Sequence, residues 1–217
     1  SSIYTVLVTG GANGVKDLAG NSVTSDTAAS FLTPAQPASV QSSIWTNSNT
    51  PAIADSGDGG AVELGVRFTA DSDGFVTGVR FYKSAANTGT HVGNLWSSNG
   101  QLLATAMFTN ETASGWQQVH FATPVAITAG TTYVASYFAP SGHFAADRNY
   151  FSSQYNSGLM HVPAGGGVNA DGNASQFPSD TFQNSNYWVD VVLRTPPIAD
   201  SIAPTVSLFT PASGNSD

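Results

Sequence analysis

The chain has 217 residues, of which 41% are hydrophobic and only 9% are charged, and it contains no cysteine. This length and hydrophobic content suffice for one domain with a sizeable core plus attachments, while the formal net charge of -8 argues against nucleic acid and anionic membrane surfaces as partners. The lack of cysteine excludes disulfides and thiolate metal sites, and no apolar run approaches the roughly 20 residues that span a bilayer.

The first predicted element lies in the stretch YTVLVTGGANGVKDLAGN, residues 4–21. A strand that runs into TGGANG is how many dinucleotide-binding domains begin, with glycines beside a helix N-terminus. Gly10 and Gly14 fit that pattern, but Lys16 stands where another glycine belongs, and the polar segment that follows has no apolar helical stripe. We therefore expect two strands joined by Gly/Asn turns.

The next feature is a pair of proline-rich stretches, TPAQPASV at 33–40 and TPPIADSIAP at 195–204. Proline stiffens a connection and withholds a ladder hydrogen bond. These stretches predict linkers at 34–40 and 195–204 on either side of a central domain, residues 41–194.

Inside this central domain, apolar side chains recur with a period of two, which is typical of half-buried strands. No segment has a sustained 3.6-residue apolar stripe, and turn residues such as Asn99 and Gly100 separate the runs. Many short strands without crossover helices predict an all-β fold, an antiparallel β-sandwich of the jelly-roll kind. The predicted strands are 62–68, 75–81, 91–98, 101–110, 116–122, 131–139 and 187–193.

Asp71, Asp73 and Gly74 follow the first of these strands. The order Asp-x-Asp-Gly begins a calcium loop of the EF-hand type, but Phe75 and Tyr82 occupy later ligand positions, so that interpretation fails. Because Asp and Gly tolerate the φ angles of tight turns, we expect a β-hairpin here, with a calcium-assisted hairpin as the alternative.

The stretch at 4–21, followed by FLT at 31–33, resembles the last strands of an Ig-like module common in large secreted bacterial proteins. APTVSLFTPASG, at 203–214, resembles the first strand of the next such module. The resemblance implies module fragments at 1–33 and 205–217, neighbouring Ig-like modules as partners, and a protein that is secreted or at the cell surface.

The central block is similar to an uncharacterised domain family found between such Ig-like modules. The similarity covers most of residues 62–193, in VELGVRFTADSDGFVTGVRFYK, in the run from NTGTHVGNLW to TTYVASY, and in GHF and YWVDVVL. It implies a β-sandwich of the type used by carbohydrate-binding modules, which is an analogy of fold.

Glu63 and Asp190 are acids inside strongly apolar strands, and an arginine on the same strand face, Arg67 or Arg194, offers each an ion pair. Backbone hydrogen bonds are a second explanation. The third explanation is one structural calcium ion. It rests on an analogy with sandwich carbohydrate-binding modules, in which an acid of an early strand and an acid of the last strand bind calcium. Its predicted ligands are Glu63, Asp190, Asp55 and Asp58.

The segment APSGHFAADRNYFSSQY, residues 139–155, lacks strand periodicity and combines aromatic with polar residues. Rings stack on sugar faces, polar groups bind hydroxyls, and loops on a rigid sandwich gather binding residues. We expect a glycan or polysaccharide ligand here; the alternative is that the rings plug the end of the sandwich. The predicted binding residues are His143, Phe144, Asp147, Arg148, Tyr150 and Tyr155, with His91 and Trp45 in addition.

The four tryptophans divide by their surroundings. Trp96 and Trp116 lie in or beside predicted strands, so we expect them in the core. Trp45 precedes a polar segment and Trp188 lies close to Asp190, so these two are candidates for exposure.

No motif of an enzyme is recognisable. The histidines lack zinc spacing, no two carboxylates form a glycosidase motif, and VPAGGGVNADGN, residues 162–173, lacks the Lys-Ser/Thr of a phosphate loop. We expect that stretch to be a flexible surface loop and the protein to have no catalytic activity. The sequence thus favours a carbohydrate-binding module, with a structural or adhesive bead or assembly unit as the alternative.

Overall fold

The computed structural model describes residues 3–32, 39–57 and 59–196, and these residues form 13 strands and no helix. They belong to two units, one that contains β1 and β2 and one that runs from Ser39 to Pro196. Each unit is described by itself below. The described part of the chain contains no helix of the length and apolarity that crossing a membrane requires.

The first unit contains one antiparallel pair, β1 (Ile3–Val8) and β2 (Thr27–Leu32), in a register that places Val8 opposite Thr27. The glycine-rich segment forms the turn between them. A Cβ on Gly10 would lie 2.4 Å from the Ser25 backbone, so only glycine fits there. The prediction of strands joined by glycine turns, without a nucleotide-binding helix, is confirmed.

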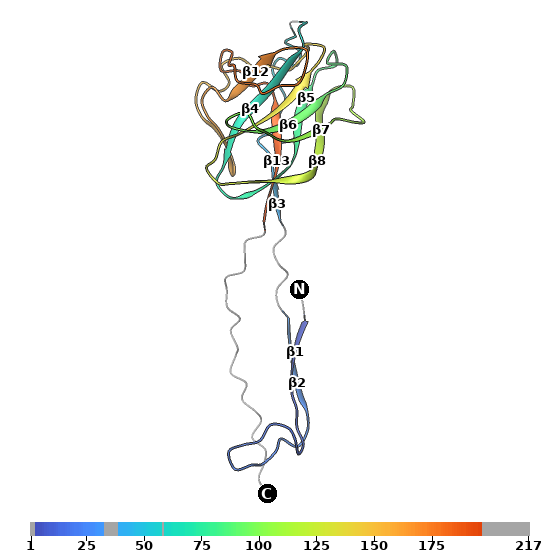
Figure 1. Ribbon diagram of the computed structural model, residues 1–217, viewed down its shortest axis with the longest axis vertical. Coiled ribbons are helices and arrows are strands. Elements are labelled where there is room, and N and C mark those ends of the chain that lie inside the picture. Colours follow the sequence, from blue (N-terminus) through green and yellow to red (C-terminus); the bar gives the residue numbers. More distant parts are fainter. Residues whose placement is uncertain (1–2, 33–38, 58, 197–217) are drawn as a thin grey trace. The chain divides into compact units, whose positions relative to one another are not determined.

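The second unit consists of two antiparallel sheets (Figure 1). The larger, seven-stranded sheet has the order β10-β11-β4-β9-β6-β7, and β12 also pairs with β4. The smaller, four-stranded sheet has the order β3-β13-β5-β8. The predicted all-β antiparallel sandwich is confirmed, and the expected central domain, 41–194, falls within this unit. The strands are β3 (Val40–Ser42), β4 (Val62–Ala70), β5 (Gly74–Lys83), β6 (Val92–Ser97), β7 (Leu102–Met107), β8 (Gly115–Ile127), β9 (Tyr133–Ala139), β10 (Tyr155–Ser157), β11 (Met160–Val162), β12 (Gly167–Asp171) and β13 (Val189–Thr195).

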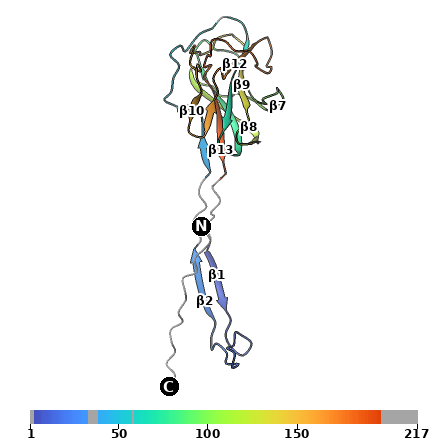
Figure 2. The same ribbon diagram turned by 90° about the vertical axis from the view of Figure 1, so that its left-hand side faces the viewer.

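The core lies between the inner faces of the two sheets. Alternation along β4 directs Leu64 and Phe68 inward, and the rings of Phe81 from β5 and Tyr137 from β9 stack with centroids 4.0 Å apart. Figure 1 and Figure 2 both place β12 at one end of this unit and β3 at the other.

The predicted hairpin between β4 and β5 is wrong. β4 is paired with β9 on one side and with β11 and β12 on the other, so β5 joins the opposite sheet. The turn therefore connects two layers. Its acids anchor it, because Asp73 accepts a hydrogen bond from the amide of Ala129 and Asp71 lies 2.8 Å from Nε2 of His161.

The prediction of a flexible loop at 162–173 is also wrong. Residues 167–171 form β12, which pairs with β4 so that Val168 lies opposite Gly65. On the outer face of the large sheet, Val168 packs with Trp96 and Val134, and Phe177 covers them. Trp96 is buried, as expected, but in this separate cluster and not between the sheets, whereas Trp116 is partly buried against the main core.

Candidate functional site

A cleft of about 290 Å³ opens where β4 and β12 meet the loop 139–155 and the segment 182–187. It combines aromatic rings with charged and amide side chains, which is the usual composition of a small-ligand site. The rings belong to Phe144, Phe182 and Tyr187, and the principal polar side chains belong to Arg148, Asn169 and Asp171.

Strand pairing places the polar groups of this cleft. In the register of β12 on β4, Asn169 lies opposite Leu64 and Asp171 opposite Val62. The Nδ2 group of Asn169 donates a hydrogen bond to the hydroxyl of Tyr187 at 2.9 Å. The cleft therefore has one wall built by residues that lie about a hundred positions from β4 in the sequence.

The Tyr187 hydroxyl interacts electrostatically with both charged side chains of the cleft, Asp171 and Arg148. Burial raises the pKa of Tyr187 most strongly, the carboxylate of Asp171 adds to this, and the hydrogen bond from Asn169 and the charge of Arg148 oppose it. The phenol is therefore neutral at pH 7 and keeps a hydroxyl proton that it can donate to a ligand.

The loop 139–155 supplies the cleft with only part of what was predicted. Phe144 and Arg148 line it. His143 is not one of the lining residues, and its Nδ1 lies 3.0 Å from Oδ1 of Asp55. This pair and the bond from the amide of Ser56 to the carbonyl of Phe144 hold residues 55–57 against the loop.

Asp147 has a structural role. Its carboxylate accepts hydrogen bonds from the amides of Ala52 (3.1 Å) and Ile53 (3.0 Å) and from Nε1 of Trp188 (3.0 Å). It thereby ties the segment before β4 to the residue before β13. Its oxygens are occupied by the protein itself.

The expected exposure of Trp45 and Trp188 is wrong. Trp45 is fully buried and Trp188 is 3% exposed, because they pack on one another with ring centroids 5.1 Å apart. Phe151 and Tyr155 join this cluster, and Tyr150 lies at its surface with 37% exposure. These rings therefore pack on the core and do not form an exposed binding platform.

The predicted calcium ligands do not come together. Glu63 lies on the outer face of the large sheet, Asp190 belongs to the small sheet, and Asp55 pairs with His143. Asp58 lies outside the described residues. No three His, Asp or Glu side chains among the described residues are placed to hold a metal ion. Calcium binding stays a prediction.

Residues 48–189 match the model of a family described as a domain of unknown function, DUF4082. The chain belongs to the DUF4082 family. The match includes all three rings of the cleft and its polar residues Arg148, Asn169 and Asp171. No curated protein matches the chain.

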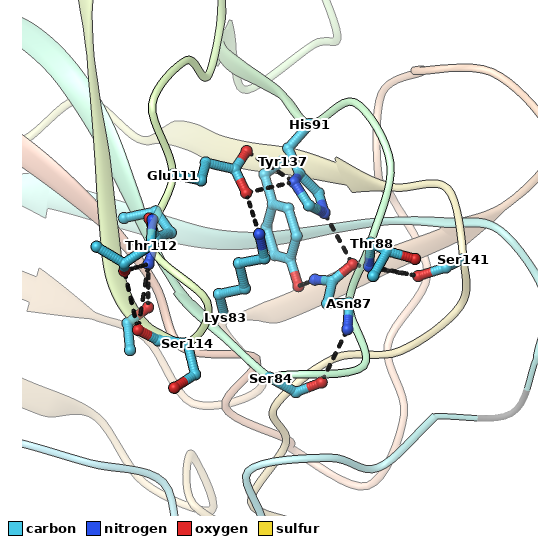
Figure 3. Close-up of polar contacts among 12 residues, drawn as sticks. Lys83, Ser84, Asn87, Thr88, His91, Glu111, Thr112, Ser114, Tyr137 and Ser141 are labelled. Atoms are coloured by element: carbon cyan, nitrogen blue, oxygen red, sulfur yellow. Dashed lines mark hydrogen bonds and ion pairs between the residues drawn. The ribbon is translucent and has the colours of Figure 1, made fainter.

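His91 of the DUF4082 domain is buried in a polar network and not in the cleft (Figure 3). Its Nδ1 lies 2.8 Å from Oε1 of Glu111, and its Nε2 lies 2.8 Å from Oδ1 of Asn87. Lys83 donates to Glu111 at 2.6 Å, and Asn87 donates to the hydroxyl of Tyr137. Both ring nitrogens are thus occupied, which leaves His91 no group for a ligand.

The network also affects the charge of His91. Burial lowers the pKa of the imidazole, and the contact with Glu111 partly opposes this. The Glu111 carboxylate and Oδ1 of Asn87 are both acceptors, so the two contacts together need an N–H on each ring nitrogen, whereas burial favours the neutral ring, which has only one.

Sequence reasoning missed Asn169, Asp171, Phe182 and Tyr187 as cleft residues of the DUF4082 domain. A signal was present, since residues 168–171 read Val-Asn-Ala-Asp, an alternation of apolar and polar side chains. The glycines before this run concealed it, because three consecutive glycines favour a loop.

Proposed function

We propose that the DUF4082 domain is a non-catalytic binding module that holds a carbohydrate in the cleft. The observation that carries this proposal is the meeting of three rings with Arg148, Asn169 and Asp171 in one cleft of about 290 Å³. Aromatic faces pack on the C–H surfaces of sugars, and the polar side chains suit hydroxyl groups. The volume is at the lower end of ligand pockets, roughly 300–1,000 Å³, which suits a short sugar unit.

The arrangement of acids supports a binding role without catalysis. Glycosidases use two carboxyl groups that flank the scissile bond. Asp171 is the one carboxylate among the described residues that lines the cleft, and Asp147 close by is bonded to backbone amides and Trp188.

We further propose that the parent protein is a secreted or cell-surface bacterial protein with Ig-like neighbours. The support comes from the sequence: the absence of cysteine, the low share of charged residues, and the resemblance of residues 4–21 to the end of an Ig-like module.

A screen of immobilised polysaccharides tests the binding function with one matched pair of variants. Phe182→Ala removes a cleft ring that is 51% exposed, and Phe75→Ala removes a ring that is 37% exposed and lies on β5, outside the cleft. We expect the wild type and Phe75→Ala to be retained and Phe182→Ala to bind about tenfold more weakly. Absence of retention on every polysaccharide would refute the proposal.

A structural or assembly role is the second candidate, and the β1–β2 ribbon favours it. Ile3 is 71% exposed, Val6 54% and Leu7 59%, although a two-stranded ribbon is only marginally stable alone. The edge of a strand is a template for strand addition. Light scattering tests this role: mass that grows with protein concentration supports assembly, and a constant monomer mass argues against it.

A further inference from the structure

We propose that the cleft selects a carbohydrate that bears a carboxylate, such as a hexuronate, and that Arg148 binds this carboxylate. This inference rests on the proposed binding function and deepens it, because it names the chemical class of the ligand.

Arg148 is available for an anion. Its side chain is exposed at the cleft, and its guanidinium carbon lies 5.7 Å from the centroid of the Phe182 ring. Across the part of the chain that the structure describes, its guanidinium makes no hydrogen bond and no ion pair. The ring contact orients the cation but supplies no acceptor oxygen, so the N–H groups can form a fork for a carboxylate.

Three other cationic side chains of the sandwich already have partners within the protein. Arg80 pairs with Asp190 and Lys83 with Glu111. Arg67 donates to the carbonyls of Gly165 and Ser179. The chain has only six Lys and Arg residues and a net charge of -8. The guanidinium of Arg148, which has no partner among the described residues, is therefore suited to bind an anionic group of a ligand.

The remaining polar groups suit the rest of a sugar ring. The neutral Tyr187 hydroxyl lies under the electrostatic influence of Arg148 and Asp171 together. A carboxylate on Arg148 would be kept away from Asp171 by charge repulsion, and the Asp171 oxygens would then accept hydrogen bonds from sugar hydroxyls. An acidic sugar would therefore lie in the cleft with its carboxylate toward Arg148 and its hydroxyl groups toward Asp171.

Titration calorimetry with oligogalacturonate and with its methyl ester tests the inference, because the ester removes the charge and keeps the ring. The matched variants are Arg148→Gln and Arg194→Gln. Arg194 is also an exposed arginine over an aromatic ring, but it pairs in register with Gln41 of β3, away from the cleft lining. Both variants change the net charge equally, so long-range repulsion is controlled.

We expect the wild type and Arg194→Gln to bind the acid about tenfold more tightly than the ester, and Arg148→Gln to bind the two alike. Added salt should weaken binding of the acid more than binding of the ester.

Three results would overturn the inference and leave the binding function intact: equal affinity for acid and ester, tighter binding of glucosamine oligomers, or retention of neutral polysaccharides without any response to oligogalacturonate. Failure of the wild type to bind any of these sugars, or any polysaccharide of the screen, would instead refute the binding function itself.

Discussion

Glu63 is a fully buried acid, and no cation among the described residues forms an ion pair with it. Its Oε1 accepts hydrogen bonds from Oγ of Ser136 (2.5 Å) and Nδ2 of Asn94 (2.9 Å). Within the described ranges, its Oε2 has no hydrogen-bond partner of good geometry. The predicted partner, Arg67, binds backbone carbonyls. Burial raises the pKa of Glu63 above its usual 4.5, and the hydrogen bonds only partly oppose this. The side chain is therefore a group whose ionisation works against folding.

We predict that Glu63→Gln removes a pH dependence of stability. Above pH 4.5 the unfolded chain releases the Glu63 proton while the folded protein retains it, so the free energy of unfolding of the wild type falls as pH rises from 4.5 toward the folded-state pKa. Glutamine keeps the size and cannot ionise. Urea unfolding of both proteins between about pH 4 and about pH 8 measures this, and parallel curves for the two proteins would contradict it.

Asp190 shows how strand register corrects a sequence expectation. The register of β13 on β5 places it opposite Arg80, so it pairs with that residue at 3.7 Å and not with Arg194. Burial raises its pKa to about 6, while Arg80 and the amide of Ile44 oppose this. An ion pair was foreseen at Asp190, but its partner lies 110 residues away along the chain and could not be read from local spacing.

At the scale of elements, β12 decides whether the cleft exists. Its first residue, Gly167, is packed so tightly that a Cβ there would lie 1.7 Å from the carbonyl oxygen of Ser185. The segment 185–187 carries Tyr187, a wall of the cleft. Glycine at this position therefore permits a close approach of two backbones, and it is not evidence of flexibility.

We predict that Gly167→Ala lowers the free energy of unfolding by about 1–3 kcal/mol, because a backbone segment has to move. Gly172→Ala is the control, since its Cβ meets only the end of the Gln176 side chain within 3 Å, and it should change stability by about 0.5 kcal/mol or less. Denaturant unfolding of both variants measures the difference. Equal effects would show that the contact between Gly167 and Ser185 is not tight.

At the scale of the whole molecule, protection of the backbone should differ between strands. β9 lies between β4 and β6, and β13 lies between β3 and β5, so both have partners on each side. Among the described strands, β1 and β2 pair only with one another, and their side chains include Ile3 and Leu7, which are 71% and 59% exposed. Strands with two partners in a packed sandwich open rarely, whereas a two-stranded ribbon opens readily.

We predict that the amides of β1 and β2 exchange with deuterium at least about a hundredfold faster than those of β9 and β13, because their opening costs several kcal/mol less. Hydrogen exchange followed by mass spectrometry measures this at peptide resolution. Similar protection in the ribbon and in β9 would contradict the prediction and would indicate that the ribbon is covered.

Local pattern was sufficient for the fold class and for seven strands of the central domain, including β4, β5 and β13, because alternation with period two depends only on neighbouring residues. It was also sufficient to mark the loop 139–155, which supplies Phe144 and Arg148 to the cleft. Which strands pair, that Trp45 is buried, and that Asn169, Asp171 and Tyr187 complete the cleft were decided by the tertiary structure. Pairing and burial are contacts between residues far apart in the chain, and local spacing carries no record of them.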